Sequence, residues 1–275
     1  MRISPNASRV AHLHRLKTKG ARVKVWENIV GASKADYGID APGVVRNLAI
    51  GGAVGTIIGI TLYRVLRRRY AIIARIFLGW SALSGLPNLF AAGYMIWSSK
   101  VGKLLEAERV MDILTLCGDE KVLDVGCGRG LMMIQAARRL NSGKVVGVDI
   151  WRSEDQSGNY PEAAWENALA EGVTDGIEIT DGDARDLPFE NNTFDVVISS
   201  LVLHNIDDKE ERDRAVREIS RVLKPGGQLA LVDFQYTNEY AHILGEIGIE
   251  DITLSKLHFL LYPPVRVVTG RKTAI

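Results

Sequence analysis

Carboxylates beside a glycine-rich turn are the residues of this chain most suited to binding chemistry. Gly126, Gly128 and Gly130 alternate with other residues inside VLDVGCGRG at 122–130. Glycines at this spacing let the backbone turn sharply and let a ligand touch it with no Cβ in the way. Asp124 comes two residues before the first glycine, where its carboxylate can meet a cationic ligand. The motif therefore predicts a site for a positively charged small molecule.

Two more aspartates follow at the ends of apolar runs. Asp149 closes VVGVD nineteen residues after Gly130, where it can accept hydrogen bonds from both hydroxyls of a ribose. Asp183 lies in DGDARDLPF, where it can meet an adenine amino group. A G-x-G-x-G turn alone is weak evidence, because dinucleotide-binding folds use a related one. No G-x-G-x-x-G unit opens the chain, so the carboxylates favour a charged nucleoside over a nicotinamide cofactor.

The elements that position these residues alternate from about residue 111 onward. Short apolar strands and amphipathic helices predict a doubly wound α/β sheet of seven strands, with ligands at the carboxyl ends of the strands. Helices are expected from the glycine turn to about 140, over 161–171 and 209–223, and shortly after 238. The expected strands are 121–125, 144–149, 177–180, 194–199 and 228–233, followed by an antiparallel edge pair at 249–259 and 265–269.

Two uncharged apolar runs precede this region, at 47–63 and 76–99. A membrane-spanning helix needs about 20 apolar residues, with about 17 the lower bound. Buried core helices of a soluble protein usually show a polar stripe, which these runs lack. The runs therefore predict a helical membrane hairpin. Small residues suited to helix packing and aromatic residues suited to the interfaces are Gly51, Gly52, Gly55, Gly59, Trp80, Tyr94 and Trp97.

Charge is divided unevenly along the chain. Residues 1–110 hold 17 Lys and Arg against 5 Asp and Glu, whereas residues 111–275 hold 17 against 28. The basic arm at 1–46 indicates contact with anionic membrane lipids, and an organelle transit peptide is the alternative. Arginines between the two apolar runs favour the cytosol by the positive-inside rule. Five basic residues also flank the two runs, so charge alone does not decide the topology. We expect both ends of the hairpin in the cytosol, and either Gly85 and Pro87 break the second run into a re-entrant bend or the arginines lie outside.

Four motifs in order carry a family resemblance. VLDVGCGRG, VVGVDI, DGDARDLPFENNTFDVVISS and REISRVLKPGGQLALVDF resemble class I S-adenosylmethionine-dependent methyltransferases, and most closely the small-molecule branch that includes ubiquinone/menaquinone C-methyltransferases. The resemblance covers about 104–275 and implies a Rossmann-like methyltransferase sheet that binds S-adenosylmethionine (SAM). The chain then divides into the arm, a membrane segment at 47–99 and a methyltransferase domain at 104–275 that faces the cytosol, or an organelle matrix if the arm is a transit peptide.

The resemblance also assigns residues to parts of the cofactor. The glycines would line its methionine and ribose portion, Asp124 would approach the amino group and Asp149 the ribose. The whole cofactor-binding set it implies is Asp124, Gly126, Cys127, Gly128, Gly130, Asp149, Ile150, Asp183, Ala184, Ser199, Ser200 and Leu201. The chain departs from the family at 151–160, a polar ten-residue insertion that either covers the cofactor or is a solvated surface loop.

Candidates for a general base follow the fourth and fifth strands. His204 has a suitable native pKa, although it could equally hold its loop in place. Asp233 ends a central strand at the active edge, and Asp207 and Tyr236 lie near by. No metal site is expected, because Cys117 and Cys127 have no zinc-ligand spacing.

Absent motifs and the predicted membrane segment limit the range of possible methyl acceptors. The fourth strand continues as ISSLVLHN, which contains no Asn-Pro-Pro-Tyr motif, and the catalytic half is acidic, so a nucleic-acid partner is disfavoured. A membrane tether raises the effective concentration of a lipid-borne acceptor. We expect a lipophilic small molecule such as a quinone precursor, a sterol-like compound or a phospholipid. The alternatives are a soluble or protein acceptor with the membrane only as an address, and a non-catalytic SAM-binding scaffold.

Overall fold

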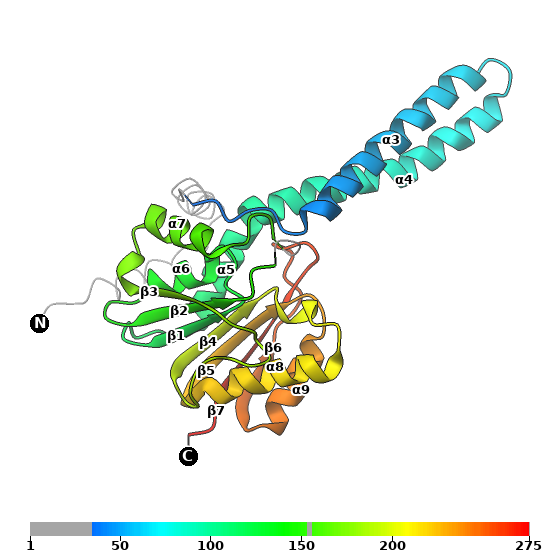
Figure 1. Ribbon diagram of the computed structural model, residues 1–275. Helices are drawn as coiled ribbons and strands as arrows, with labels where there is room; N and C mark the ends of the chain where they lie inside the picture. Colours follow the sequence, from blue (N-terminus) through cyan, green and yellow to red (C-terminus); the bar gives the residue numbers. More distant parts are fainter. Residues whose placement is uncertain (1–34, 153–155, 275) are drawn as a thin grey trace, which may run out of the picture. The chain divides into compact units, whose positions relative to one another are not determined.

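A seven-stranded sheet forms the centre of the catalytic region in the computed structural model, which describes residues 35–152 and 156–274 (Figure 1). The strand order is β3-β2-β1-β4-β5-β7-β6, with β7 antiparallel to both of its neighbours and the other pairs parallel. The order reverses between β1 and β4, the place where open α/β sheets bind ligands. The strands are β1 (Lys121–Val125), β2 (Lys144–Asp149), β3 (Ile177–Asp181), β4 (Phe194–Ser200), β5 (Leu223–Asp233), β6 (Ile249–Leu254) and β7 (Arg266–Lys272).

Helices cover both faces of the sheet because its strands are apolar on both faces. In-register Leu123, Val146 and Val197 face α8 and α9, where they join one hydrophobic core. The Asp208 carboxylate caps α8 by accepting a hydrogen bond from the Glu211 N–H. The opposite face carries α5, α6 and α7. The helix bounds are α5 (Lys103–Ile113), α6 (Leu131–Ala137), α7 (Pro161–Glu171), α8 (Lys209–Val222) and α9 (Thr237–Glu246).

The predicted seven strands and their edge pair are confirmed, with differences at their ends. α6 ends at Ala137 rather than near 140. β5 begins at Leu223 and runs through the Pro-Gly-Gly sequence, because Phe194 of β4 pairs with Leu223 before a register shift. β6 stops at Leu254, whereas β7 continues to Lys272 alongside β5 and β6.

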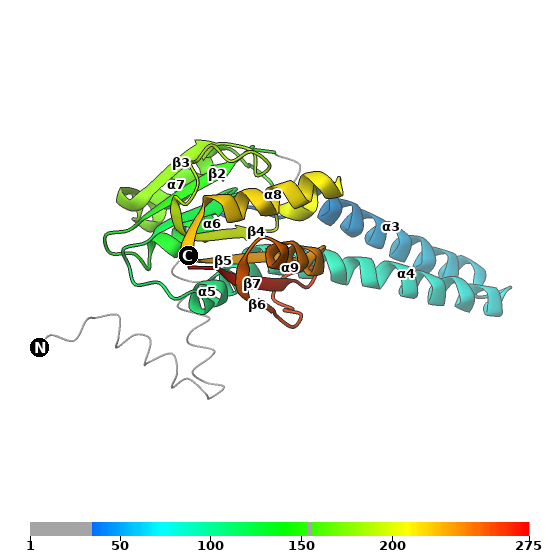
Figure 2. The same ribbon diagram turned by 90° about the horizontal axis from the view of Figure 1, so that it is seen from below.

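The two apolar runs form a helical hairpin, α3 (Pro42–Leu66) and α4 (Ala71–Trp97), which lie side by side in Figures 1 and 2. Both helices are long and apolar enough to cross a membrane, judged by length and composition alone. Gly52 and Gly59 lie at their contact, where a Cβ on Gly59 would come 2.0 Å from the Ser81 Cβ. A Cβ on Gly51 or Gly55 would meet nothing within 4 Å, although the Gly55 carbonyl accepts from Ser81 Oγ at 2.8 Å. Only part of the predicted glycine set therefore makes close helix packing possible.

The predicted break at Gly85 and Pro87 is wrong. α4 is one helix with Pro87 inside it, and Gly85 packs against Thr56 of α3. A helix in a packed pair tolerates one proline, since it loses a single main-chain hydrogen bond. After Trp97 the chain continues through a short π-helix, η1 (Ser98–Gly102), directly into α5. Of the predicted basic arm, residues 1–34 lie outside the described residues.

Replacing Gly59 by valine should separate α3 from α4, because overpacking a close contact costs about 1–3 kcal/mol. Amide exchange of the α3 peptides, measured by mass spectrometry on the full chain in detergent micelles, should therefore increase. Gly51→Val places the same residue in the same helix where a Cβ would meet nothing within 4 Å, and it should leave exchange unchanged. Equal exchange in the two variants would contradict the packing described above.

Candidate functional site

A cavity of about 560 Å³ opens at the carboxyl ends of β1, β2 and β4, within the usual size range of small-molecule sites. It brings together residues that lie far apart in the sequence. The predicted cofactor residues that line it are Asp124, Gly126, Cys127, Gly128, Asp149, Ile150, Asp183, Ala184, Ser200 and Leu201. Gly130 and Ser199 are not among the lining residues, and the Ser199 hydroxyl instead donates to the Val125 carbonyl inside the sheet.

The glycine turn adopts backbone conformations that other residues rarely take. Gly126, Gly128 and Gly130 have φ values of 72°, 52° and 85°. A Cβ on Gly126 would lie 2.2 Å from the Val202 side chain, and one on Gly128 would lie 2.7 Å from Gln156 Oε1. Gly130 shapes the turn that starts α6 without lining the cavity. The turn therefore brings bare backbone to the cavity wall, as the sequence predicted.

The Asp149 carboxylate is fixed by main-chain donors at the end of β2. Its Oδ2 accepts from the Gly128 N–H at 2.8 Å, and its Oδ1 accepts from the Trp151 N–H at 2.7 Å. Trp151 has a φ of 60°, an unfavourable value for a side-chain-bearing residue that turns the chain back toward this carboxylate. The two oxygens are held in place. Oδ1 also accepts from Asn159 Nδ2 at 3.4 Å, so Oδ2 is the oxygen that keeps a lone pair with which it can accept from a ligand hydroxyl.

Asp124 is almost fully buried and accepts one hydrogen bond, from the Met133 N–H at 2.9 Å. Burial raises the pKa of this carboxyl to about 7, and the neighbouring Asp149 charge adds to the effect. A cation bound in the cavity would favour the ionised form. Burial likewise raises the pKa of the Cys127 thiol, whose sulfur packs against Gly147, so this cysteine is an uncharged wall residue.

Asp183 is engaged by its neighbour Arg185. The guanidinium donates to both carboxylate oxygens, at 2.9 Å from Nε to Oδ1 and 2.5 Å from Nη2 to Oδ2. This ion pair holds the pKa of Asp183 below its usual value. Asp183 lines the cavity as expected. Its ion pair with Arg185 was not predicted from the sequence.

His204 lines the cavity from the short helix that follows β4, whereas Asp233 lies behind it and is almost fully buried. Asp233 Oδ2 accepts from the His204 N–H at 3.1 Å and from the Tyr240 hydroxyl at 3.2 Å. Asp233 Oδ1 lies 2.8 Å from His204 Nδ1, off the direction of a well-aligned hydrogen bond. Asp233 thus holds His204 in position. Tyr236, another candidate base, stacks against the Arg212 guanidinium and is not among the residues that line the cavity.

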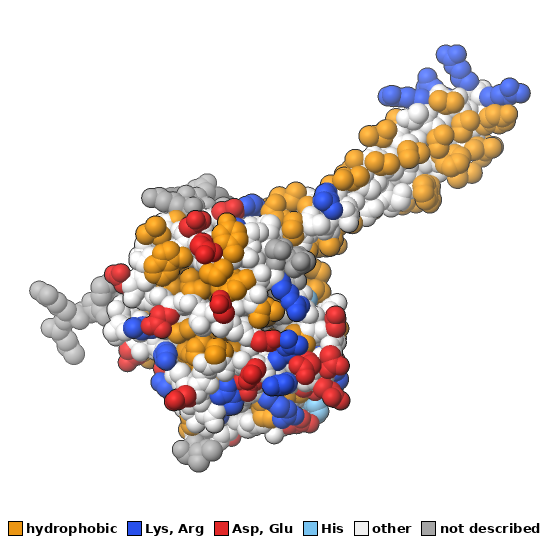
Figure 3. Space-filling model, in the orientation of Figure 1, with side chains coloured by type: hydrophobic (Ala, Val, Ile, Leu, Met, Phe, Trp, Pro, Cys, Tyr) orange, Lys and Arg blue, Asp and Glu red, His pale blue; other side chains and the backbone are white. Residues whose placement is uncertain are grey.

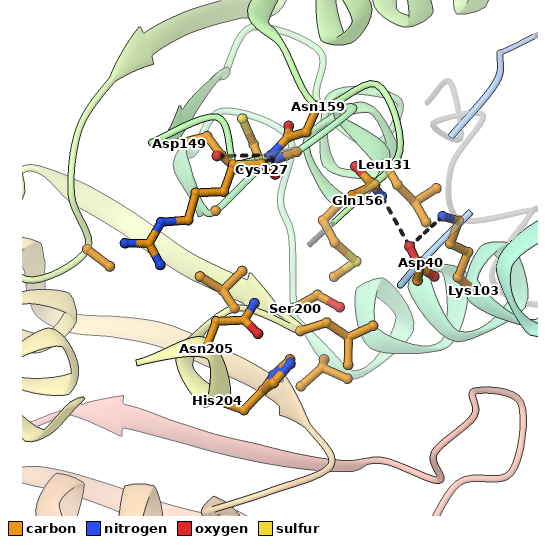
Figure 4. Close-up of a pocket in the computed structure, with 18 of the residues that line it drawn as sticks. Asp40, Lys103, Cys127, Leu131, Asp149, Gln156, Asn159, Ser200, His204 and Asn205 are labelled. Carbon is orange, nitrogen blue, oxygen red and sulfur yellow. Dashed lines mark hydrogen bonds and ion pairs between the residues drawn. The ribbon is translucent and has the colours of Figure 1, made fainter. Parts of the chain in front are cut away.

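The polar insertion at 151–160 contributes to the cavity wall, so it is more than a solvated surface loop. Gln156 Oε1 accepts from the Arg129 N–H of the glycine turn, and Gln156 Nε2 donates to Asp40 Oδ1 (Figure 4). Lys103 donates to the same Asp40 oxygen at 3.0 Å. Asn159 lines the cavity with an Oδ1 that accepts no hydrogen bond from the described residues. Gln156 and Asn159 belong to no sequence motif, and only the length of the insertion indicated that they could be functional. Asp40 and Lys103 had no signal in the sequence.

The same cavity continues to the end of the apolar hairpin. Met95 and Ser98 at the end of α4 line it, together with Leu261, Tyr262 and Pro263 of the loop before β7. The Tyr262 N–H donates to Ser98 Oγ, and the Tyr94 hydroxyl donates to the Phe259 carbonyl, so this loop is attached to the hairpin.

The charge of the lining fits SAM, a cationic sulfonium nucleoside. Acidic side chains along the cavity outnumber Lys and Arg by eight to four. Asp124 supplies a buried carboxylate beside the bare turn, and Asp149 supplies fixed acceptors at the β2 end. Such a lining disfavours a polyphosphate cofactor, whose charge is negative. No group of His, Cys, Asp and Glu suited to a metal ion occurs among the described residues.

Comparison with known proteins supports this assignment. Residues 123–231 match a family model described as a methyltransferase domain. Over 115 residues, 42% of this chain and 42% of the relative, the chain is 36% identical to a ubiquinone/menaquinone biosynthesis C-methyltransferase of Idiomarina loihiensis. It is 36% identical to the 27-O-demethylrifamycin SV methyltransferase of Amycolatopsis mediterranei, over 50% of this chain and 49% of that protein. It is 34% identical to a sterol 4-C-methyltransferase of Caenorhabditis elegans, over 48% and 36%.

Solved structures show the same fold. A putative O-methyltransferase from Nostoc punctiforme aligns with a TM-score of 0.51 at 20% identity, over 65% of this chain and 60% of that one. A [4+2]-cyclase aligns with a TM-score of 0.53 at 21% identity, over 65% and 83%. The chain thus contains a SAM-dependent methyltransferase domain, although it spans only about half or less of the length of the curated relatives named above.

The affinity for SAM should depend on pH through Asp124. Its carboxyl is mostly neutral at pH 5.5 and half ionised near pH 7, and the cation binds the ionised form. Calorimetric titration should show an affinity that rises about tenfold from pH 5.5 to 7, a range in which the α-amino group of SAM stays charged. Asp124→Asn should remove most of this rise.

Asp183→Asn is the matched control, because the lowered pKa of Asp183 keeps it charged throughout that range. This variant should keep the pH dependence of the unmodified chain. An affinity that does not change with pH in the unmodified chain would show that the Asp124 charge plays no part in binding.

Proposed function

We propose that this protein is a membrane-bound methyltransferase that transfers the methyl group of SAM to a small lipophilic acceptor. The observation that carries the proposal is the continuity of one cavity. Its lining runs from Asp149 and the glycine turn to Met95 and Ser98 at the end of the apolar hairpin. An acceptor dissolved in the bilayer would reach the cofactor without crossing water.

The surface of the hairpin supports a membrane location. Apolar side chains cover its length in Figure 3, and Ile72 and Leu83 are 75% and 80% exposed. α3 has 25 residues, about 37 Å at 1.5 Å per residue, which suffices for a hydrocarbon core of about 30 Å. Basic side chains gather at the turn, Arg64 and 67–69, where they meet phosphate headgroups. The catalytic domain would face the cytosol, or an organelle matrix, where SAM is found.

The relatives support a lipophilic acceptor class. Their names specify a quinone, a sterol and a rifamycin as substrates. All three are largely apolar, ring-containing molecules. The apolar residues at the hairpin end of the cavity, Met95 and Leu261, match such a molecule in polarity.

Residues of the chain have distinct tasks in this reaction. When bound, SAM supplies an electrophilic methyl group, whose bond to sulfur breaks as the acceptor nucleophile forms a new one. The glycine turn, Asp124 and Asp149 hold the cofactor, and alignment of the two partners supplies most of the acceleration. His204 takes the proton that the acceptor loses, through Nε2, since Nδ1 lies against Asp233. Asp233 positions the ring and stabilises its protonated form.

The full chain in lipid nanodiscs, given methyl-labelled SAM and a total lipid extract, tests the proposal. Label should appear in molecules that partition into organic solvent. Label found only in water-soluble products or in protein would contradict the proposal. It would favour a methyltransferase that is located at a membrane but acts on a soluble or protein acceptor. SAM binding with no labelled product in any fraction would indicate a non-catalytic scaffold.

His204→Asn should lower the single-turnover rate of methyl transfer by about 100-fold or more, the usual contribution of a general base. The affinity for SAM should stay within about twofold, because His204 belongs to the acceptor side of the site. Asp207→Asn, a neighbouring change in the cavity lining, should have little effect on either quantity. A His204→Asn enzyme with the unmodified rate would exclude His204 as the base.

A further inference from the structure

One continuous helix connects the membrane hairpin to the interior of the cavity. α4, η1 and α5 follow each other without a loop from Ala71 to Ile113. The residues of this helix that line the cavity recur at intervals of three or four over most of their length, which places them on one face. They are Met95, Ser98, Lys103, Glu106, Ala107 and Val110. This stripe leads from the end of the apolar hairpin toward the cofactor side.

The polar groups on the stripe differ in whether they have partners. Ser98 Oγ accepts from the Tyr262 N–H, and the Lys103 ammonium is bound by Asp40. Glu106 is different. Its Oε1 lies 2.6 Å from Nδ1 of the buried His258, but its Oε2 is buried and accepts no hydrogen bond from any described residue.

An unsatisfied carboxylate oxygen in a buried position is costly and is rare in folded proteins. Glu106 and His258 have side chains only 2% and 3% exposed, so bulk water does not satisfy this oxygen. Glu106 itself lines the cavity, so a ligand donor that enters the wall at this residue can satisfy the oxygen. The ligand must be a hydrogen-bond donor, since a carboxylate only accepts.

We propose that Glu106 Oε2 binds a hydroxyl group on the head of an amphipathic acceptor, whose apolar tail extends past Leu261 toward Met95 and the hairpin. This inference rests on the proposed function and names its substrate class as a hydroxyl-bearing lipid. Glu106 determines which acceptors bind, while His258 holds its other oxygen. His204 remains responsible for the proton at the methylated atom.

Two probes that differ only in the hydroxyl test the proposal, namely 4-dodecylphenol and its methyl ether 4-dodecylanisole. Their binding to the full chain in nanodiscs is measured by calorimetry, with S-adenosylhomocysteine present so that no turnover occurs. The unmodified protein should prefer the phenol by about tenfold or more, as expected for a hydrogen bond to a charged group. Glu106→Gln should reduce this preference to about twofold or less.

Glu108→Gln is the matched control, since Glu108 lies on the same helix but pairs with Arg139 and does not line the cavity. It should keep the full preference. Comparing ratios between the two probes cancels their partition into lipid and any general loss of stability. The affinity for S-adenosylhomocysteine, measured alongside, should be the same in all three proteins.

Equal binding of the two probes to the unmodified protein, or binding of neither, would overturn the proposal. A preference that survives Glu106→Gln would also overturn it, because Glu106 would then only anchor the loop at His258. These outcomes are separate from the proposed function, which fails if no methyl group reaches any lipid-soluble product.

Discussion

Lys103 lies where three segments of the chain meet. Its ammonium donates to the Tyr37 carbonyl at 2.6 Å and to Asp40 Oδ1 at 3.0 Å, and Gln156 Nε2 donates to the same two oxygens at 3.2 Å. Lys103 is 6% exposed, so losing either partner of the ion pair would leave a poorly compensated charge. Asp40 lies two residues before α3, and Lys103 is the first residue of α5. One ion pair therefore joins the segments that flank the apolar hairpin.

The same network reaches the cofactor turn. Gln156 Oε1 accepts from the Arg129 N–H, and the Arg129 guanidinium donates to the Asp36, Ser157 and Gly158 carbonyls. The segment before the hairpin, the insertion and the glycine turn thus share their hydrogen-bond partners. A movement of the segments that flank the hairpin must therefore disturb the glycine turn, so the apolar hairpin and the cofactor site are mechanically coupled.

Local patterns were sufficient to predict the sheet, the hairpin and the carboxylates, because each depends on a short run of residues. VLDVG and VVGVD are buried strands that end in a turn, and their acids must lie at one edge of a parallel sheet. Asp40, Lys103 and Gln156 carry no such signal, since their partners lie up to 119 residues away. The helix break predicted at Pro87 was wrong for the opposite reason. Its local signal to break a helix is outweighed by the packing of α4 against α3.

The relatives share one type of domain but are named for different acceptors, and the geometry explains how this is possible. A [4+2]-cyclase shares the fold, so the sheet alone does not determine the reaction. The methyltransferase match spans residues 123–231, which include the glycine turn, Asp149 and His204. Several residues that line the cavity, including Met95, Glu106 and Leu261, lie outside that match. The predicted cofactor residues therefore lie in the shared segment, whereas α4, α5 and the loop before β7 supply lining residues from outside it.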